Sequence, residues 1–251
     1  MMARSVASRI GWSLLALSPA ALALVLPAPL RWLTLGAAIA FAVATAAITR
    51  ALRADAWRHW HRDPGALLSC VLAWVWIQSM APSASGGPLA AAAIAAAVHS
   101  TFGGTGQSPF HPAAVGAAAV LLLAPGAHFA LSEPITTIAL AIGGLLMLGR
   151  KLVSPMSVLG WFAGLVAGSL LAGRLHLAPL DWLTPAHLLV GFFVLADGSA
   201  GLRTPARLFC GLAGGVLAST LPGPAALPCA VLLANLLAPS VEQALLSRAR
   251  A

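Results

Sequence analysis

Long apolar runs follow one another along the whole chain, separated by short polar or Gly/Pro-rich segments. The runs are continuous and rich in Ala and Leu, without the alternation of apolar and polar positions that is typical of membrane β-strands. A membrane-spanning helix needs about 20 apolar residues. The pattern therefore predicts an all-α polytopic membrane protein with about ten helices, each membrane-spanning or partly re-entrant. The expected helices cover Ile10–Leu26, Leu33–Thr49, Gly65–Met80, Leu89–Phe102, 111–124, Ile135–Leu148, Val153–Ala172, Pro185–Ala196, Leu208–Thr220 and Ala225–Ala238.

Composition agrees with this pattern. The chain is 60% hydrophobic and 8% charged, with a mean hydropathy of +0.92, whereas about a quarter of the residues of a soluble domain are charged. Nothing in the 251 residues suggests a separate soluble domain, so we expect one integral membrane domain over residues 1–251. A second apolar run follows the first at once without a clear cleavage site, which indicates a retained first helix and not a signal peptide.

The positions of the charges predict the topology. With ten spans and a cytoplasmic N-terminus, all but two of the 14 Lys and Arg residues, Arg31 and Arg174, fall on the cytoplasmic side. The net charge of +8 is therefore a topology signal and does not indicate nucleic-acid binding. We expect a multi-pass protein of the bacterial inner membrane with both termini in the cytoplasm. Because five helices per half is an odd number, the halves 1–130 and 131–251 would form inverted repeats.

Small residues indicate where helices pack closely. Gly160, Gly164 and Gly168 are four residues apart in one expected helix, and Gly211 and Gly215 repeat the spacing in another. Such stripes let two helix backbones approach each other. Packing within the chain is favoured over a subunit interface. The three cysteines are isolated in apolar surroundings, which favours packing over a metal or iron–sulfur site; they are Cys70, Cys210 and Cys229.

A Gly/Pro-rich break at Gly103–Gly116 interrupts the apolar pattern. Backbone that cannot form a helix survives in a bilayer only where protein or a water-filled cavity covers it. The two prolines would start a new helix at about Phe110, and its N-terminus would suit an anionic or electron-rich group such as a flavin phosphate. A simple turn between two helices is the alternative. The candidate cofactor-binding residues are Gly103, Gly104, Gly106, Ser108, Pro109, His111 and Pro112.

Polar residues near two later helices are candidates for an ion or electron pathway. Asp197 ends the apolar run that follows Gly191, and Thr204 lies seven residues further on. Acids at a membrane boundary are functional candidates, although Asp197 could instead cap a helix or pair with an arginine. Asn235 lies within an apolar helix, where it should bond to another helix or face a cavity. His99 and His111 flank the break, but no spacing makes them a metal or haem pair, so no metal site is predicted.

Together these segments resemble the membrane-protein family that includes RnfD of the Rnf electron-transport complex and NqrB of the sodium-pumping NADH:quinone oxidoreductase. Family members carry a GGxGxNPFNPAxxG-like segment, which here is Gly103–Gly116, with Ser108 and His111 in place of two asparagines. A phenylalanine-rich run leads into an acid, Asp197, and a later Thr204-Pro205. The family's LLxNLxAP-like helix is matched by Leu232–Pro239.

The resemblance implies a membrane subunit that handles flavin-linked electrons, coupled to Na⁺ or H⁺ movement, with flavoproteins and other subunits as partners beside membrane lipid. The resemblance thus implies a subunit of an oxidoreductase or ion-translocating complex rather than a stand-alone enzyme. The family binds covalent FMN at a threonine of an SGAT-like loop. Here the corresponding loop, 125–134, contains no such motif, and Thr136 and Thr137 do not match its context. We therefore expect noncovalent FMN or riboflavin and not covalent FMN.

Two other functions stay open. The family's fold resembles that of urea-type channels, so the chain could be a small-solute or flavin transporter without redox activity. It could also be an assembly subunit without a cofactor. His111, which can titrate near neutral pH, could tune a flavin, relay a proton or only donate a hydrogen bond.

Overall fold

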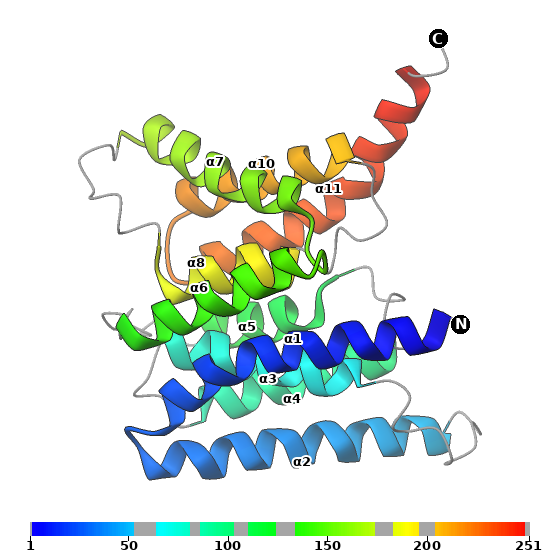
Figure 1. Ribbon diagram of the computed structural model, residues 1–251, viewed down its shortest axis with the longest axis vertical. Helices are drawn as coiled ribbons and strands as arrows, with labels where there is room; N and C mark the ends of the chain where they lie inside the picture. Colours follow the sequence, from blue (N-terminus) through cyan, green and yellow to red (C-terminus); the bar gives the residue numbers. More distant parts are fainter. Residues whose placement is uncertain are drawn as a thin grey trace.

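A computed structural model describes residues 2–52, 64–80, 86–102, 110–123, 134–173, 183–195 and 204–248. Helices fill almost all of these segments and run side by side (Figure 1). They are α1 (Met2–Val25), α2 (Pro29–Leu52), α3 (Gly65–Met80), α4 (Gly87–Thr101), α5 (Pro112–Leu123), α6 (Pro134–Gly149), α7 (Pro155–Leu171), α8 (Pro185–Leu189), the π-helix η3 (Val190–Val194), α10 (Thr204–Thr220) and α11 (Ala226–Arg248). Each expected apolar segment corresponds to one of them, with α8 and η3 forming a single element. The all-α polytopic prediction is confirmed.

Proline residues explain where several of the helices begin. α2, α5, α6, α7 and α8 all begin with proline, whose fixed φ and missing N–H suit the first position of a helix.

By length and composition, three described helices are apolar enough to cross a membrane: Ser8–Val25, Pro29–Thr49 and Ala226–Ser247. The others are shorter. α5, with 12 residues, is about 18 Å long, well below the roughly 30 Å of a hydrocarbon core.

Two helices continue through a proline. α11 runs to Arg248, ten residues beyond the expected end at Ala238, and contains Pro239. α1 contains Pro19, which cannot donate to the carbonyl of Leu15. The hydroxyl of Ser18 donates to that carbonyl at 2.8 Å instead, so the carbonyl of Leu15 still accepts a hydrogen bond. The prediction that the last helix ends before Pro239 was wrong, because one missing backbone bond does not end a helix whose neighbouring turns are intact.

Helices far apart in sequence meet in matching pairs. α1 lies against α6, α3 against α8, and α5 against α11. Some contacts inside the first five helices have counterparts in the rest: α2–α4 with α7–α10, and α4–α5 with α10–α11. α1 and α6 are antiparallel, since Ser13 lies near Met147 while Arg9, nearer the start of α1, reaches Leu152 beyond the end of α6.

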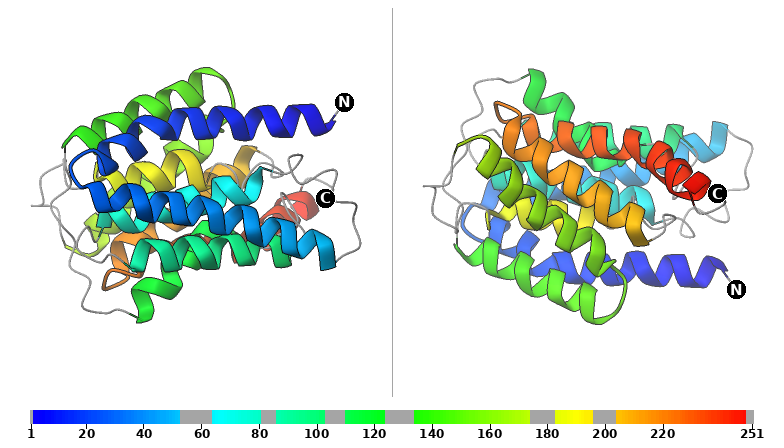
Figure 2. Two further views of the ribbon diagram at one scale, coloured as in Figure 1. Left: turned by 90° about the horizontal axis from the view of Figure 1, so that it is seen from below. Right: turned by 90° about the horizontal axis from the view of Figure 1, so that it is seen from above.

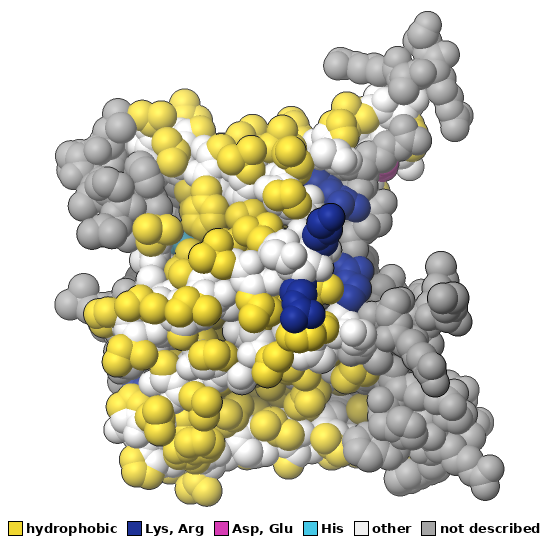
Figure 3. Space-filling view, in the orientation of Figure 1, with side chains coloured by type: hydrophobic (Ala, Val, Ile, Leu, Met, Phe, Trp, Pro, Cys, Tyr) yellow, Lys and Arg dark blue, Asp and Glu magenta, His cyan; other side chains and the backbone are white. Residues whose placement is uncertain are grey.

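The described charges are unevenly placed. α1 begins and α11 ends at the same end of the helices, as the two views in Figure 2 show. Lys and Arg side chains gather at that end in Figure 3, over a surface that is otherwise largely apolar. Among the described side chains, Arg9, Arg150, Lys151 and Arg207 form this basic end, and Arg31 lies at the start of α2, at the other end. Exposed apolar side chains such as Leu33, Ile142 and Leu159 cover the outward faces of α2, α6 and α7, as expected for surfaces that face lipid.

Candidate functional site

The centre of the protein is a junction of four elements, α1, α3, α6 and α8–η3. α3 is buried along nearly its whole length, and α8 and η3 are buried almost throughout. α3 contacts both α1 and α8, and α6 contacts the same two elements. The four elements therefore enclose a common axis, with α3 and α8–η3 buried and α1 and α6 exposed on their outer faces.

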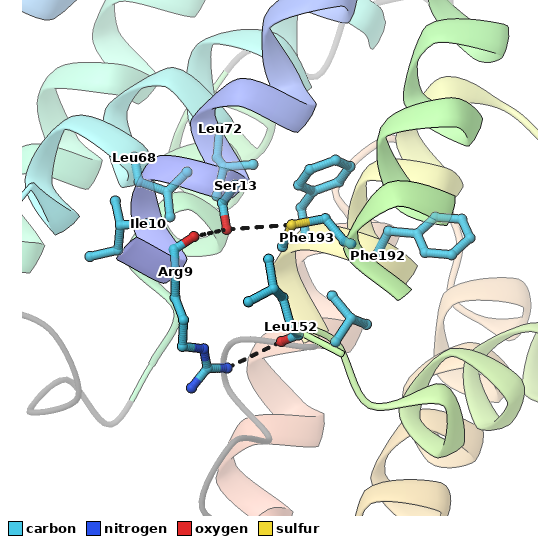
Figure 4. A pocket seen from close by; sticks show the side chains of 10 residues that line it. Arg9, Ile10, Ser13, Leu68, Leu72, Leu152, Phe192 and Phe193 are labelled. Atoms are coloured by element: carbon cyan, nitrogen blue, oxygen red, sulfur yellow. Dashed lines mark hydrogen bonds between the residues drawn. The ribbon is translucent and has the colours of Figure 1, made fainter. Parts of the chain in front are cut away.

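A small pocket lies in this junction near the basic end (Figure 4). Its lining comes from all four elements and the turn after α6: Arg9, Ile10, Ser13, Leu68, Leu72, Met147, Leu152, Val153, Phe192 and Phe193. The volume is about 30 Å³, which is room for about two water molecules. A flavin ring system does not fit in this space, whereas water or a small ion does.

One side of the pocket carries polar atoms. The Arg9 guanidinium donates to the carbonyl of Leu152 at 3.1 Å. The Ser13 hydroxyl lies 3.1 Å from the carbonyl of Arg9 and 3.8 Å from Sδ of Met147. A hydroxyl has one hydrogen to donate, so Ser13 can exchange between these two acceptors or turn towards the pocket. Arg9 ties α1 to the turn after α6 beside the pocket.

Two phenylalanines form the opposite wall and come from the π-helix η3. Phe192 packs against Phe162 of α7, with ring centroids 6.0 Å apart, and a Cβ at Gly144 would overlap its ring. Phe193 reaches the Gly143 position of α6. π-helical turns are uncommon and occur frequently at functional sites. Here the wider turn places both consecutive rings among the residues that line the pocket.

Two buried polar side chains, Trp76 of α3 and Thr136 of α6, lie on the inner faces of these helices, further from the basic end than the pocket. Trp76 is four residues beyond Leu72 on the same face of α3, and Thr136 belongs to the buried face of α6 that includes Leu140 and Met147. Trp76 is fully buried and Thr136 is 1% exposed. Neither Nε1 of Trp76 nor Oγ1 of Thr136 has a hydrogen-bond partner in the described part of the chain. Such atoms cost free energy unless water or a ligand reaches them.

The Gly103–Gly116 break is described only at its second end. Gly103, Gly104, Gly106, Ser108 and Pro109 lie outside the described residues. The new helix begins at Pro112, two residues after the expected start, because His111 supplies the carbonyl that accepts from the N–H groups of Ala114 and Val115, at 3.0 and 3.2 Å. His111 itself is 6% exposed. The N–H groups of Ala114 and Val115 in the first turn thus already donate to the backbone and are not available to a ligand.

Of the predicted pathway residues, Thr204 and Asn235 lie within the described structure, on α10 and α11. Asp197 lies outside the described residues. Thr204 is the exposed first residue of α10, and Asn235 is half-buried on α11. The carbonyl of Asn235 loses its helical donor, since the residue four positions later is Pro239. None of the predicted site residues is among those that line the pocket.

Sequence reasoning missed the pocket residues because they form no motif. They come from four segments spread over most of the chain, and most are apolar. Arg9 was seen only as a topology signal, and Phe192 and Phe193 only as part of the run before Asp197. The one local signal was the paired phenylalanines within a glycine-containing helix.

Comparison with known protein families gives a match to the NQR2, RnfD, RnfE family over residues 2–134. The matched region is more than half of the chain and includes α1–α5 and the whole Gly103–Gly116 break. The segments around Asp197 and Asn235 lie beyond it. No curated protein matches the chain.

Proposed function

The chain belongs to the NQR2, RnfD, RnfE family, and we propose that it is a membrane subunit of an Rnf/Nqr-type complex that handles flavin-linked electrons coupled to Na⁺ or H⁺ movement. The family match is the observation that carries this proposal. Membership fits a membrane subunit of such complexes, and the apolar helices fit its place in a membrane. We further propose the bacterial inner membrane, with the basic end in the cytoplasm.

The paired contacts of α1 with α6, α3 with α8, and α5 with α11 support an inverted-repeat interpretation. A two-fold axis lying in the membrane plane brings each helix next to its own counterpart wherever the helix approaches the axis. On this interpretation the halves 1–130 and 131–251 meet at the four-element junction. A path between the halves would then run past the pocket, Trp76 and Thr136.

A noncovalent FMN or riboflavin remains our proposal for the Gly103–Pro112 break, including His111 and Pro112. Such a cofactor supplies one- and two-electron chemistry when bound. The pocket does not fit it, since it holds about two water molecules, and Thr136 is too buried to serve as an attachment residue. The flavin proposal therefore rests on the break and on the family.

The pocket favours a second candidate, a path for a small ion or solute along the junction. Met147, Phe192 and Phe193 contribute its apolar lining, and Ser13 supplies a hydroxyl. Arg9 at the basic end opposes cation entry in this arrangement, so a cation path would require its side chain to move. Such a path fits both a redox protein coupled to ion movement and a transporter without redox activity.

One purification separates the redox candidate from the transporter. The protein is isolated with the subunits that co-purify, its visible spectrum is recorded, and denaturation then tests whether any flavin stays attached to the chain. A flavin that a partner reduces supports the redox candidate. A flavin-free protein that moves solute into liposomes overturns it.

Two substitutions of His111 test the cofactor part of the proposal. We expect His111→Ala to lower flavin retention at least tenfold, while His111→Asn, which restores an amide, preserves folding and flavin. His99→Ala is the matched control, since His99 is also buried but belongs to α4. If His111→Asn removes the protein from the membrane, His111 is structural and its assignment to the cofactor site fails.

A further inference from the structure

Three exposed cations meet where α1 begins and α6 ends. Arg9 lies on α1, and Arg150 and Lys151 lie on the turn after α6. The bond from Arg9 to the carbonyl of Leu152, 3.1 Å long, holds the start of α1 against this turn. Figure 3 shows the Lys and Arg side chains at this end of the surface. We call Arg9, Arg150 and Lys151 the basic cluster.

No carboxylate neutralises the basic cluster within the described segments. The acidic residue described there is Glu242, on α11, and α11 packs against α10 and α5 and not against α1 or α6. The single side-chain hydrogen bond of the cluster in the described structure is the one that Arg9 donates to Leu152. Within the described segments, the donors of Arg150 and Lys151 are therefore available to an anion.

The backbone of Lys151 is in a conformation that its side chain disfavours. Lys151 has φ of 55°, the one positive value among the described non-glycine residues. It closes the end of α6, with the N–H of Lys151 donating to Leu148 at 2.9 Å and that of Leu152 to Met147 at 3.0 Å. This is a Schellman motif, whose left-handed position is usually glycine. The turn thus carries a charged side chain where glycine would form the same bonds with less strain.

An aromatic side chain packs against Arg150 beside the turn after α6. The Arg150 guanidinium lies over the ring of Trp12, 4.0 Å from the ring centroid. Tryptophan is enriched at the boundary between the hydrocarbon and the headgroups. The contact with the ring leaves the N–H groups of Arg150 able to donate to an oxyanion.

Apolar surface continues directly from the basic cluster along the outside of α6 and α1. Ile142, Leu145 and Leu146 are 58%, 63% and 37% exposed, and they lie one to two turns before Arg150. Leu15 of α1 is 54% exposed. A ligand that binds here therefore meets positive charge at one end and hydrocarbon-like surface over the next turns.

We propose that the basic cluster and this apolar surface form a binding site for one anionic phospholipid. The phosphate lies among Arg9, Arg150 and Lys151, and the acyl chains lie along α6 and α1. Basic residues at helix ends bind anionic headgroups in this way. An acidic protein surface would use the cations but would leave the adjoining leucines and isoleucine uncovered, so the observations favour a lipid.

The test titrates phosphatidylglycerol, with phosphatidylcholine in parallel, into the full-length protein in neutral detergent and counts bound lipid by native mass spectrometry. We expect phosphatidylglycerol to bind preferentially, with an affinity that falls as salt is added. Lys151→Gly and Arg150→Gln should each weaken its binding about fivefold. Lys151→Gly is the sharper variant because it keeps the turn and removes only the side chain.

Arg31→Gln is the matched control. It removes one positive charge from the other end of the protein, where Arg31 donates to the carbonyl of Leu24 at 2.7 Å, and it should leave phosphatidylglycerol binding unchanged. Equal binding of the two lipids, wild-type affinity in Lys151→Gly, or an equal loss in Arg31→Gln overturns the proposal. Preferential loss of a co-purifying acidic protein in Lys151→Gly, with lipid binding intact, assigns the cluster to a protein partner instead.

Discussion

The α7–α10 pair and the four-element junction use glycine in different ways. On α7, a Cβ at Gly160 or Gly164 would overlap the backbone carbonyls of Leu208 or Leu212 of α10. On α10, a Cβ at Gly211 or Gly215 would overlap backbone carbonyls of α7. In the junction, a Cβ at Gly144 would instead overlap the ring of Phe192, although Gly143 beside it approaches the carbonyl of Ala16.

This difference separates a fixed contact from an adaptable one. Two backbones in direct contact cannot yield without moving a whole helix, whereas a ring can change its rotamer. The Ser219 hydroxyl, 3.1 Å from the carbonyl of Leu165, adds a further link between α10 and α7. We therefore expect α7 and α10 to move as one unit and any rearrangement along a path to occur where the Phe192 ring packs on Gly144, since Gly143 meets the carbonyl of Ala16 in the same way as the glycines of α7 meet α10.

The largest predicted effect is at the fixed contact. Gly164→Leu should push α10 away from α7 and destabilise the protein by at least about 3 kcal/mol. Thermal unfolding in detergent measures this with a thiol-reactive dye, because Cys70 and Cys210 are buried until the helices separate. Since such unfolding is often irreversible, apparent midpoints are compared at one heating rate.

Gly36→Leu is the control for that substitution. Gly36 lies on the exposed side of α2, with no atom within 4 Å of a Cβ. The change there should stay within about 0.5 kcal/mol. An equal loss in both variants would mean that helix insertion, and not the α7–α10 contact, is affected.

The second prediction concerns the adaptable contact. Gly144→Ala should cost about 2 kcal/mol, because the ring of Phe192 must shift. Adding Phe192→Leu should restore at least half of this loss, as a coupling in a double-mutant cycle. No side-chain substitution should rescue Gly164→Ala in the same way, since its obstacle is the carbonyl of Leu212. Additive effects of Gly144→Ala and Phe192→Leu would remove the distinction between the two contacts.

The fixed contact could be predicted from sequence, and the junction could not. Glycines four residues apart are a local pattern, and their packing within the chain is confirmed by the contacts of Gly160 and Gly164 with α10. The helices were predicted for the same reason, since apolar runs and prolines act locally. The end of α11 was misplaced because Pro239 has a local effect that the rest of the helix overrides.

The junction depends on long-range pairing, which has no local pattern. Ser13 and Met147 meet only because α1 and α6 pack antiparallel across the two halves. The π-helical turn at Phe192 depends on contacts of its rings with Phe162 and the Gly144 position. The cofactor and pathway residues, from Gly103 to Asn235, stay predictions, because the break and Asp197 lie largely outside the described residues.

The third prediction asks whether the junction is dry. Thr136→Val keeps the shape of the side chain and removes a buried hydroxyl that has no partner in the described structure. In a dry junction it should stabilise the protein by about 1.5 kcal/mol. Thr137→Val, at a half-buried neighbouring position, should have little effect. Destabilisation by Thr136→Val would indicate that water binds the hydroxyl and would favour a hydrated path.

The smallest predicted effect lies at the basic end of the junction. Lys151→Gly should stabilise the protein by about 0.5–1 kcal/mol in neutral detergent, because relief of left-handed strain exceeds the added chain entropy of glycine. Gly173, after α7, is the reciprocal control, with φ of 67° and open space around a Cβ. Gly173→Ala should destabilise by a similar amount. If anionic lipid binds at Lys151, adding phosphatidylglycerol should remove most of this gain, since about fivefold tighter binding stabilises the wild type by up to about 1 kcal/mol more than Lys151→Gly. A gain for Lys151→Gly that persists in phosphatidylglycerol would leave the strained lysine without a functional reason and would reduce the basic end to a topology signal.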